Sequence, residues 1–180
     1  MKYAIWNKTE KPIGIVQIIY DQNFEPMRYD DFAQILNRHR FLVYGCDMKS
    51  ACDLARETYE LPVFLIGVGR GGEFVQEICH KKQNFAGAIS ILARTPMLKR
   101  FGRVFPLKFG VAHGPKIPLM IVGGWSAVRQ MQAHVSVGRD AKNENLSLLV
   151  YPEISVRNAF GLIEKDVINF LNDVCVRATI

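Results

Sequence analysis

A glycine-rich turn after a short apolar run is the part of the chain best suited to chemistry. The run 62–66 (PVFLI) is too short for a helix and predicts a buried strand. Gly67, Gly69, Gly71 and Gly72 follow it, and a helical pattern begins directly afterwards. Glycines permit positive φ, and the N–H groups that open a helix have no partners within the helix. Such groups hold an anion or stabilise an oxyanion.

One interpretation of the turn is a dinucleotide site. Gly67, Gly69 and Gly72 satisfy the pattern GxGxxG between a strand and a helix, and Arg94 after the next strand is placed to meet a 2′-phosphate. However, that pattern belongs on the first strand of its fold, whereas this turn follows the third predicted strand. The acidic residue that normally lies about 20 positions on is also absent.

A second interpretation is a nucleophile elbow, the strained turn that presents a catalytic serine in the motif GxSxG. Gly69 stands at the serine position, and Gly67 and Gly71 are small because side chains there would collide within the turn. This interpretation predicts Gly69 at the tip of the turn, with positive φ, between a central parallel strand and a helix. The simplest alternative is a glycine-rich turn that serves no site.

Cysteines and histidines show no pattern that decides a function. The cysteines are Cys46, Cys52, Cys79 and Cys175. They form no CxxC pair and no metal-type spacing with the four histidines, which predicts free thiols and no metal site. Cys46 beside Asp47 is a candidate relocated nucleophile, with His113 or His134 as its base. A packed thiol explains Cys46 more simply, and Ser126 is interpreted as a loop cap.

The order of apolar runs and helical patterns predicts the fold class. The predicted strands are 13–20, 41–45, 62–66, 86–92, 118–122 and 146–151, and the predicted helices include 29–36, 74–79 and 163–174. Strands that are apolar throughout and alternate with helices imply one doubly wound α/β domain over residues 1–180, with a mostly parallel sheet. No run reaches the about 20 apolar residues of a membrane span. No signal-peptide core follows the start, so we expect a soluble cytoplasmic protein.

Positive charge is concentrated in one segment of the chain. The net charge is +6, and residues 94–116 contain six Lys or Arg residues and no Asp or Glu. The other 17 basic residues balance the 17 acidic ones. Leu98, Phe101 and Phe105 lie at helical spacing here, before Pro106 would stop a helix. A solvated face is the simplest explanation, and a patch for an acidic partner, a phosphate or a membrane surface is the alternative.

A series of segments, in the right order, resembles the lysophospholipase and monoacylglycerol-lipase branch of the α/β-hydrolases, the serine aminopeptidase-like family. The segments are 11–20 (first core strand), 28–36 (RY-xx-(F/L)A helix), 41–47 (strand ending in aspartate), 65–72 (GHSMGG elbow), 85–96 (strand closed by proline), and 117–124 with 149–152 (strands that deliver the acid and the histidine). The resemblance covers Lys11 to Asp173. It implies an α/β-hydrolase fold, and in the family a serine, a histidine and an acid hydrolyse esters.

The departures from the family fall on its catalytic positions. The nucleophile position is Gly69, and the acid position falls on Ser126 or Ala127. The histidine position is Val156, and Tyr20-Asp21 replaces the His-Gly of the oxyanion motif. Only 20 residues, 97–116, occupy the place of the family's multi-helix cap. The resemblance therefore implies a reduced fold that lacks the cap and leaves the site open to water.

We therefore expect a non-catalytic protein, without cofactor or metal, that binds a small ligand near Gly69 or a protein partner. The candidate ligand-binding residues are Tyr20, Asp21, Gly69, Arg70 and Trp125. Loss of the cap predicts exposed apolar surface, hence self-association or a dedicated partner between Met97 and Phe109, and no specific nucleic-acid binding. Two alternatives stay open: a carboxylic-ester hydrolase with relocated catalytic residues, and a dinucleotide-binding module that uses Gly67 to Gly72.

Overall fold

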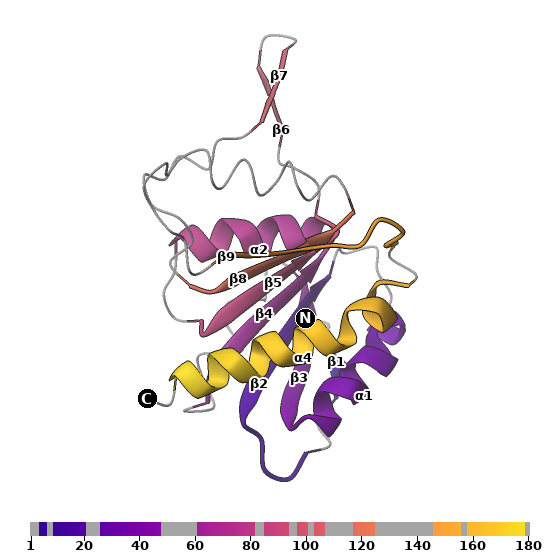
Figure 1. The fold of residues 1–180 in the computed structure, drawn as a ribbon, viewed down its shortest axis with the longest axis vertical. Helices are drawn as coiled ribbons and strands as arrows, with labels where there is room; N and C mark the ends of the chain where they lie inside the picture. The colour runs from indigo at the N-terminus through magenta and orange to yellow at the C-terminus, as the bar shows by residue number, and fades with distance from the viewer. Residues whose placement is uncertain are drawn as a thin grey trace.

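Strands and helices follow one another along the chain. The strands form a sheet, and helices cover both of its faces (Figure 1). The computed structural model describes residues 4–6, 9–20, 26–47, 61–81, 85–93, 97–100, 103–106, 117–124, 146–155 and 158–178. The main sheet contains β1 (Ala4–Ile5), β2 (Gly14–Tyr20), β3 (Phe41–Asp47), β4 (Val63–Val68), β5 (Gly87–Ile91), β8 (Leu119–Gly123) and β9 (Leu146–Val150). A separate hairpin consists of β6 (Met97–Arg100) and β7 (Arg103–Pro106). The helical elements are η1 (Pro26–Tyr29), α1 (Asp30–Arg38), α2 (Arg70–Lys81) and α4 (Ala159–Ala178).

The main sheet is parallel apart from one edge. Its strand order is β1-β3-β2-β4-β5-β8-β9, and among the described strands of this sheet only β1 pairs antiparallel with its neighbour. Each predicted strand is present, with ends that differ from the observed ones by at most two residues, so the prediction of a doubly wound, mostly parallel sheet is confirmed. The two-residue strand β1 was not predicted, because it is too short to show a pattern.

The core has two layers, one on each face of the sheet. In β2, Val16 and Ile18 pack with α1 and α4, whereas Ile15 and Ile19 pack with α2. Figure 1 shows α2 on the opposite side of the sheet from α1 and α4. Both faces of the central strands are therefore removed from water, which explains why their sequences are apolar throughout instead of alternating.

Residues 97–100 and 103–106 form a hairpin instead of the helix that the spacing of Leu98, Phe101 and Phe105 favours. The backbone register pairs Leu98 with Phe105 and Lys99 with Val104. A separation of seven residues spans two helical turns, but it also brings two residues opposite each other across a short hairpin. The pattern alone therefore could not distinguish the two structures.

Two glycines allow β4, β2 and the first turn of α2 to approach closely. A Cβ atom on Gly67 would collide with the carbonyl group of Gly71, and one on Gly71 would collide with the carbonyl oxygen of Ile19. These obstacles are backbone atoms, which cannot rotate away as a side chain can. The prediction that the turn has no room for side chains at these two positions is confirmed.

We expect Gly71→Ala to lower the free energy of unfolding by about 3 kcal/mol, because α2 must move away from β2 to accept the methyl group. The matched control is Gly161→Ala on the exposed face of α4, where an added Cβ meets nothing within 4 Å. That change should raise the free energy of unfolding by about 0.5–1 kcal/mol, since alanine favours the helix. Urea denaturation measures both, and equal stability of the two variants would contradict the described packing.

Candidate functional site

The connections of the sheet change direction between β2 and β4. From β2 the chain passes through α1 to β3 on one side, and from β4 it passes through α2 to β5 on the other side. Because α1 and α2 cover opposite faces, the carboxyl ends of β2 and β4 form a topological switch point. Open α/β sheets bind their ligands at such a point. Gly69 directly follows β4, so the topology itself selects the glycine-rich turn as the candidate site.

The turn after β4 has the geometry of a nucleophile elbow. Gly69 has a φ of +57° and is followed at once by Arg70, the first residue of α2. The amide of Gly69 donates to the carbonyl oxygen of Ile91 (2.9 Å), and its own carbonyl accepts from the amide of Glu73 (3.2 Å). A Cβ atom on Gly69 would meet nothing within 4 Å. The predicted backbone of the turn is confirmed, and its tip has space for a side chain that glycine does not supply.

A buried network of polar groups holds the residues that follow the turn at Gly69. The side-chain amide of Gln76 on α2 donates to Oγ of Ser90 on β5 (2.8 Å), and this hydroxyl donates to the carbonyl oxygen of Gly72 (3.1 Å). Gln76 and Ser90 are fully buried. Since buried polar groups are costly without partners, these bonds favour one placement of the first turn of α2 against β5. The sequence analysis missed this network, because Gln76 and Ser90 lie 14 residues apart in different elements.

The predicted ligand-binding residues occupy different environments. Arg70 lies next to Gly69 and is exposed. Tyr20 ends β2, but its ring is only 5% exposed and stacks with Tyr29, with ring centroids 6.1 Å apart. Tyr20 therefore belongs to the core layer beneath α1 and α4 and does not present its ring to solvent. Asp21, Trp125, Ser126, Ala127 and Val156 lie outside the described residues.

The buried thiols near the elbow are unsuited to nucleophilic attack. Cys46 on β3 and Cys79 on α2 lie among the apolar residues between the sheet and α2, and both are fully buried. Burial raises the pKa of Cys79 to about 12, which keeps its thiol protonated at neutral pH. The interpretation of Cys46 as a packed thiol is supported. The two histidines proposed as its base, His113 and His134, lie outside the described residues.

A contact missed by the sequence analysis joins the end of β9 to α4. The hydroxyl of Tyr151 donates to Oδ2 of Asp166, and the amide of Tyr151 donates to the carbonyl oxygen of Gly123 (2.9 Å). The hydrogen bond to Asp166, then partial burial and the nearby negative charge, raise the pKa of Tyr151 to about 12. Because these residues are 15 positions apart across a loop, no local pattern indicates that they meet.

The loop after β9 is also held at its far end. The side-chain oxygen of Asn158 accepts from the amide (2.7 Å) and the hydroxyl (2.9 Å) of Ser155, and its amide group donates to the carbonyl oxygen of Glu153 (3.1 Å). These hydrogen bonds restrain the backbone at Glu153 and Ser155, ahead of α4.

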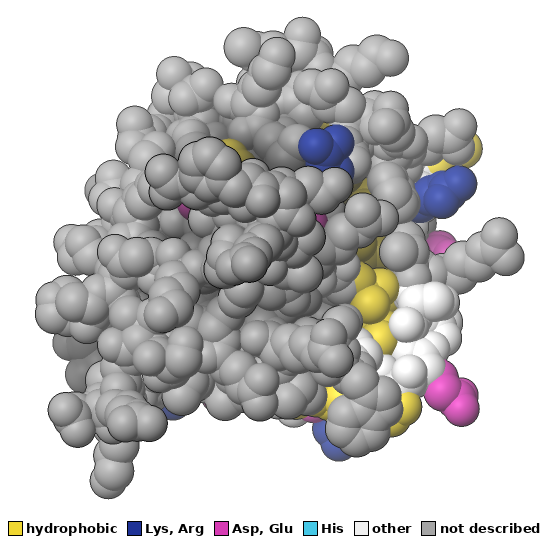
Figure 2. All heavy atoms as spheres, turned by 90° about the horizontal axis from the view of Figure 1, so that it is seen from above, with side chains coloured by type: hydrophobic (Ala, Val, Ile, Leu, Met, Phe, Trp, Pro, Cys, Tyr) yellow, Lys and Arg dark blue, Asp and Glu magenta, His cyan; other side chains and the backbone are white. Residues whose placement is uncertain are grey.

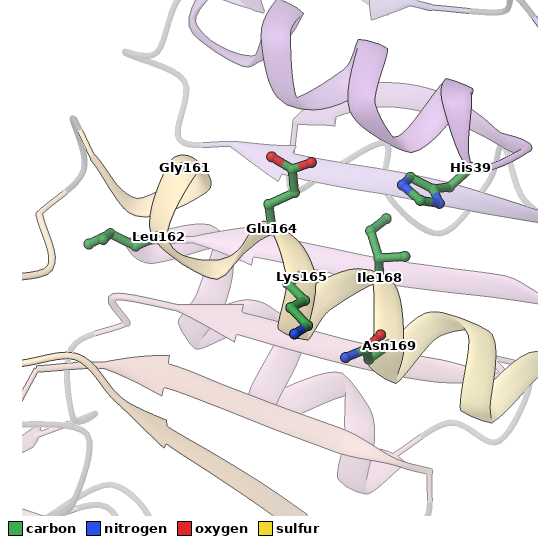
Figure 3. A pocket seen from close by; sticks show the side chains of 7 residues that line it. All are labelled: His39, Gly161, Leu162, Glu164, Lys165, Ile168 and Asn169. Atoms are coloured by element: carbon green, nitrogen blue, oxygen red, sulfur yellow. The ribbon is translucent and has the colours of Figure 1, made fainter.

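A surface pocket of about 390 Å³ lies between α4 and the end of α1 (Figure 3), lined by His39 and by residues of α4 from Gly161 to Asn169. In this view Glu164 points toward α1, whereas Lys165 points away from it. None of the predicted ligand-binding residues lines this pocket. Within the described ranges, no group of three or more His, Cys, Asp or Glu residues is placed to hold a metal ion. Likewise, no described helix is long and apolar enough to cross a membrane.

Comparison with known proteins connects the chain to a fold and not to a sequence family. No protein-family model and no curated protein sequence matches it. Its structure is similar to an esterase of Pyrococcus furiosus, with a TM-score of 0.68, 11% identity, and 98% of this chain and 91% of that chain covered. It is also similar to the esterase domain of a Rhodothermus marinus protein, with a TM-score of 0.66, 13% identity, and 98% of each chain covered. A third similar structure is MenH from S. aureus, with a TM-score of 0.69, 8% identity, and 96% of this chain and 98% of that chain covered.

The Tyr151–Asp166 contact predicts a pH dependence of stability. The folded-state pKa of about 12 lies above the ordinary value of 10.0, so folding favours the protonated phenol. Its stabilising effect is present below pH 10 and is lost as the pH rises to about 12. The free energy of unfolding should fall more steeply across this range in the wild type than in Tyr151→Phe. Urea denaturation at each pH measures it.

A second variant separates the contact from general alkaline unfolding. In Asp166→Asn the negative charge is removed, so the pKa of Tyr151 should return toward 10 in a tyrosinate absorbance titration. Parallel stability curves for the wild type and Tyr151→Phe, together with an unchanged titration in Asp166→Asn, would contradict the contact.

Proposed function

We propose that this chain, which has the α/β-hydrolase fold, is a non-catalytic binding protein. It is a degenerate, capless member of the lysophospholipase and monoacylglycerol-lipase branch, folded as one domain over residues 1–180. The observation that carries the proposal is Gly69: the elbow keeps its strained backbone, with a φ of +57° and space above it, but holds no nucleophile. An elbow without a hydroxyl or a thiol cannot form an acyl-enzyme.

The sequence at the two other catalytic positions supports the same function. Val156 stands where the histidine would accept the proton of the nucleophile, and Ser126 or Ala127 stands where an acid would orient that histidine. None of these side chains titrates near neutral pH. Three missing groups leave no partial mechanism, because the members of such a triad act together.

The start of α2 is the part of the elbow that supports binding. The amide of Arg70 opens the helix, where partial positive charge accumulates, and the exposed guanidinium of Arg70 lies on the same residue. The switch-point position of the turn places these groups where doubly wound folds bind ligands. We therefore propose a small ligand with a carboxylate, a phosphate or a polarised carbonyl group.

Large hydrophobic side chains reach the surface at a few separate places among the described residues. The exposed large hydrophobic side chains in the described ranges are Ile5, Met27, Leu162 and Val176. They are spread over β1, η1 and the two ends of α4. Figure 2 shows where the described hydrophobic side chains reach the surface on one face of the molecule.

The central test is ester hydrolysis by the wild type, Gly69→Ser and Gly69→Ala, with short-chain nitrophenyl esters and a monoacylglycerol. We expect no saturable turnover by any of them, because serine without a base is a poor nucleophile. Gly69→Ser should fold, since its side chain enters open space and the left-handed backbone costs only about 1–2 kcal/mol. Gly69→Ala carries the same strain without the hydroxyl and is the matched control.

The outcomes separate the alternatives. Turnover by the wild type would establish an ester hydrolase with relocated catalytic residues and overturn the proposal. Turnover by Gly69→Ser but not by Gly69→Ala would reveal a surviving base, which contradicts the loss of all three positions. A rise in the wild-type melting temperature with NADP, absent with a carboxylate or phosphate ester, would favour the dinucleotide-binding alternative.

A further inference from the structure

The pocket between α4 and the end of α1 is a second candidate site, separate from the turn at Gly69. Its volume of about 390 Å³ lies within the range of sites that take small molecules. His39 closes it from the end of α1, and residues between 161 and 169 of α4 form the rest of its lining. His39 lies just before β3 begins, whereas Gly69 follows the end of β4. Because β3, β2 and β4 are parallel, these two residues lie toward opposite ends of the sheet.

Gly161 leaves open space at one end of the pocket. Glycine is a poor residue within a helix, because it gains backbone freedom when the chain unfolds. Its backbone here is helical, and an added Cβ would meet no atom within 4 Å. Neither close packing nor an unusual φ therefore requires a glycine at this position, in contrast to Gly67, Gly69 and Gly71. The space that the missing side chain leaves belongs to the pocket that Gly161 lines.

Groups of opposite charge lie on the two sides of the pocket (Figure 3). Glu164 points toward α1, the helix that carries His39 at its end, whereas Lys165 points away from α1. Asn169 is four residues after Lys165 and therefore lies on the same side of α4. One side thus offers a carboxylate and an imidazole that accept hydrogen bonds, and the other offers an ammonium and an amide group that donate them.

Apolar side chains contribute the remaining surface of the pocket. Ile168 is only 6% exposed and belongs to the core layer beneath α1 and α4, so it forms a fixed floor. Leu162 is 45% exposed, and it is one of the few large hydrophobic side chains that reach solvent among the described residues. A ligand with an apolar group would cover Leu162 and remove that surface from water.

The charges of the pocket limit the class of ligand. A phosphate or another simple anion would be repelled by Glu164, and a simple amine would be repelled by Lys165. Within the described ranges, no group of three or more His, Cys, Asp or Glu residues could hold a metal ion here. A molecule that carries both an amine and a carboxylate satisfies the two sides together.

We propose that this pocket binds an α-amino acid with an apolar side chain. The ammonium group of the ligand donates to Glu164, and its carboxylate accepts from Lys165 and Asn169. Its side chain lies on Ile168 and against Leu162. The proposal goes beyond the ligand at Gly69 and does not depend on it, since the two sites share no residue.

The test is a titration of the full chain with L-leucine, followed by nuclear magnetic resonance of the backbone amides. We expect saturable shifts at His39 and at residues 161–169, with a dissociation constant of about 1 mM for a ligand of this size. Three analogues each lack one group: 4-methylpentanoate has no amine, 3-methylbutylamine has no carboxylate, and glycine has no apolar side chain. Each should bind about fivefold more weakly, because one of the three contacts is lost.

Variants of the pocket assign each contact to its residue. In Glu164→Gln, leucine and 4-methylpentanoate should bind equally, and in Lys165→Gln, leucine and 3-methylbutylamine should bind equally. Gly161→Leu fills the open space and should abolish binding of leucine. Asp173→Asn and Arg177→Gln remove exposed charges from the same helix outside the pocket, and they should leave the affinity unchanged. Circular dichroism checks that every variant is folded.

Three results would each overturn the proposal. The first is the absence of saturable shifts up to roughly ten times the expected dissociation constant. The second is equal affinity of the wild type for leucine and its three analogues. The third is a set of shifts at Gly69 and Arg70 in place of those at the pocket, which would assign the carboxylate to the turn and support the function proposed for it. The first two results leave that function untouched, because ester hydrolysis tests it separately.

Discussion

The contact between bare backbone segments at Gly67, Gly71 and Ile19 is the constraint on which the rest of the structure depends. Because Gly67 has no side chain, the carbonyl group of Gly71 can lie against it, and α2 can begin directly after the end of β4. Because Gly71 has none either, α2 lies close to Ile19 of β2. This proximity aims the start of α2 at the switch point and sets the tight turn at Gly69. The hydrogen bonds of Gln76 and Ser90 then hold that placement. A methyl group at either contact would disturb all of these features together.

The core and the elbow could be predicted from sequence because each follows from a local pattern. Unbroken apolar runs such as 63–68 indicate strands buried on both faces, and glycine spacing indicates where side chains are excluded. The contacts that complete the site could not be predicted in the same way. Tyr151 with Asp166 and Gln76 with Ser90 meet only after the sheet has formed, and nothing in their neighbours along the chain marks them. The hairpin of β6 and β7 could not be predicted for another reason. The separation of Leu98 and Phe105 fits two turns of a helix as well as a pair across two strands.

The backbone of the turn at Gly69 does not depend on the side chain at its tip. The energy needed to form the turn comes from packing of β4, β2 and α2, none of which requires a hydroxyl at position 69. Such a turn can therefore form without a nucleophile at its tip, and amides that open a helix attract electron-rich groups. Glycine also leaves more room there than serine would. A group too bulky to pass a side chain can reach the backbone at the start of α2.

Helix α4 follows all of the described strands along the chain, yet it covers the sheet face formed by the earliest of them. Ile163, Val167 and Leu171 pack with Val16 and Ile18 of β2, and the thiol of Cys175 lies 3.8 Å from the carbonyl oxygen of Ile13. During synthesis, that apolar face must wait for the helix to leave the ribosome. Until then it is exposed to chaperones and to other nascent chains, and the layer facing α2 can assemble first. Completion of this core layer therefore depends on a helix that is synthesised after all of the described strands it covers.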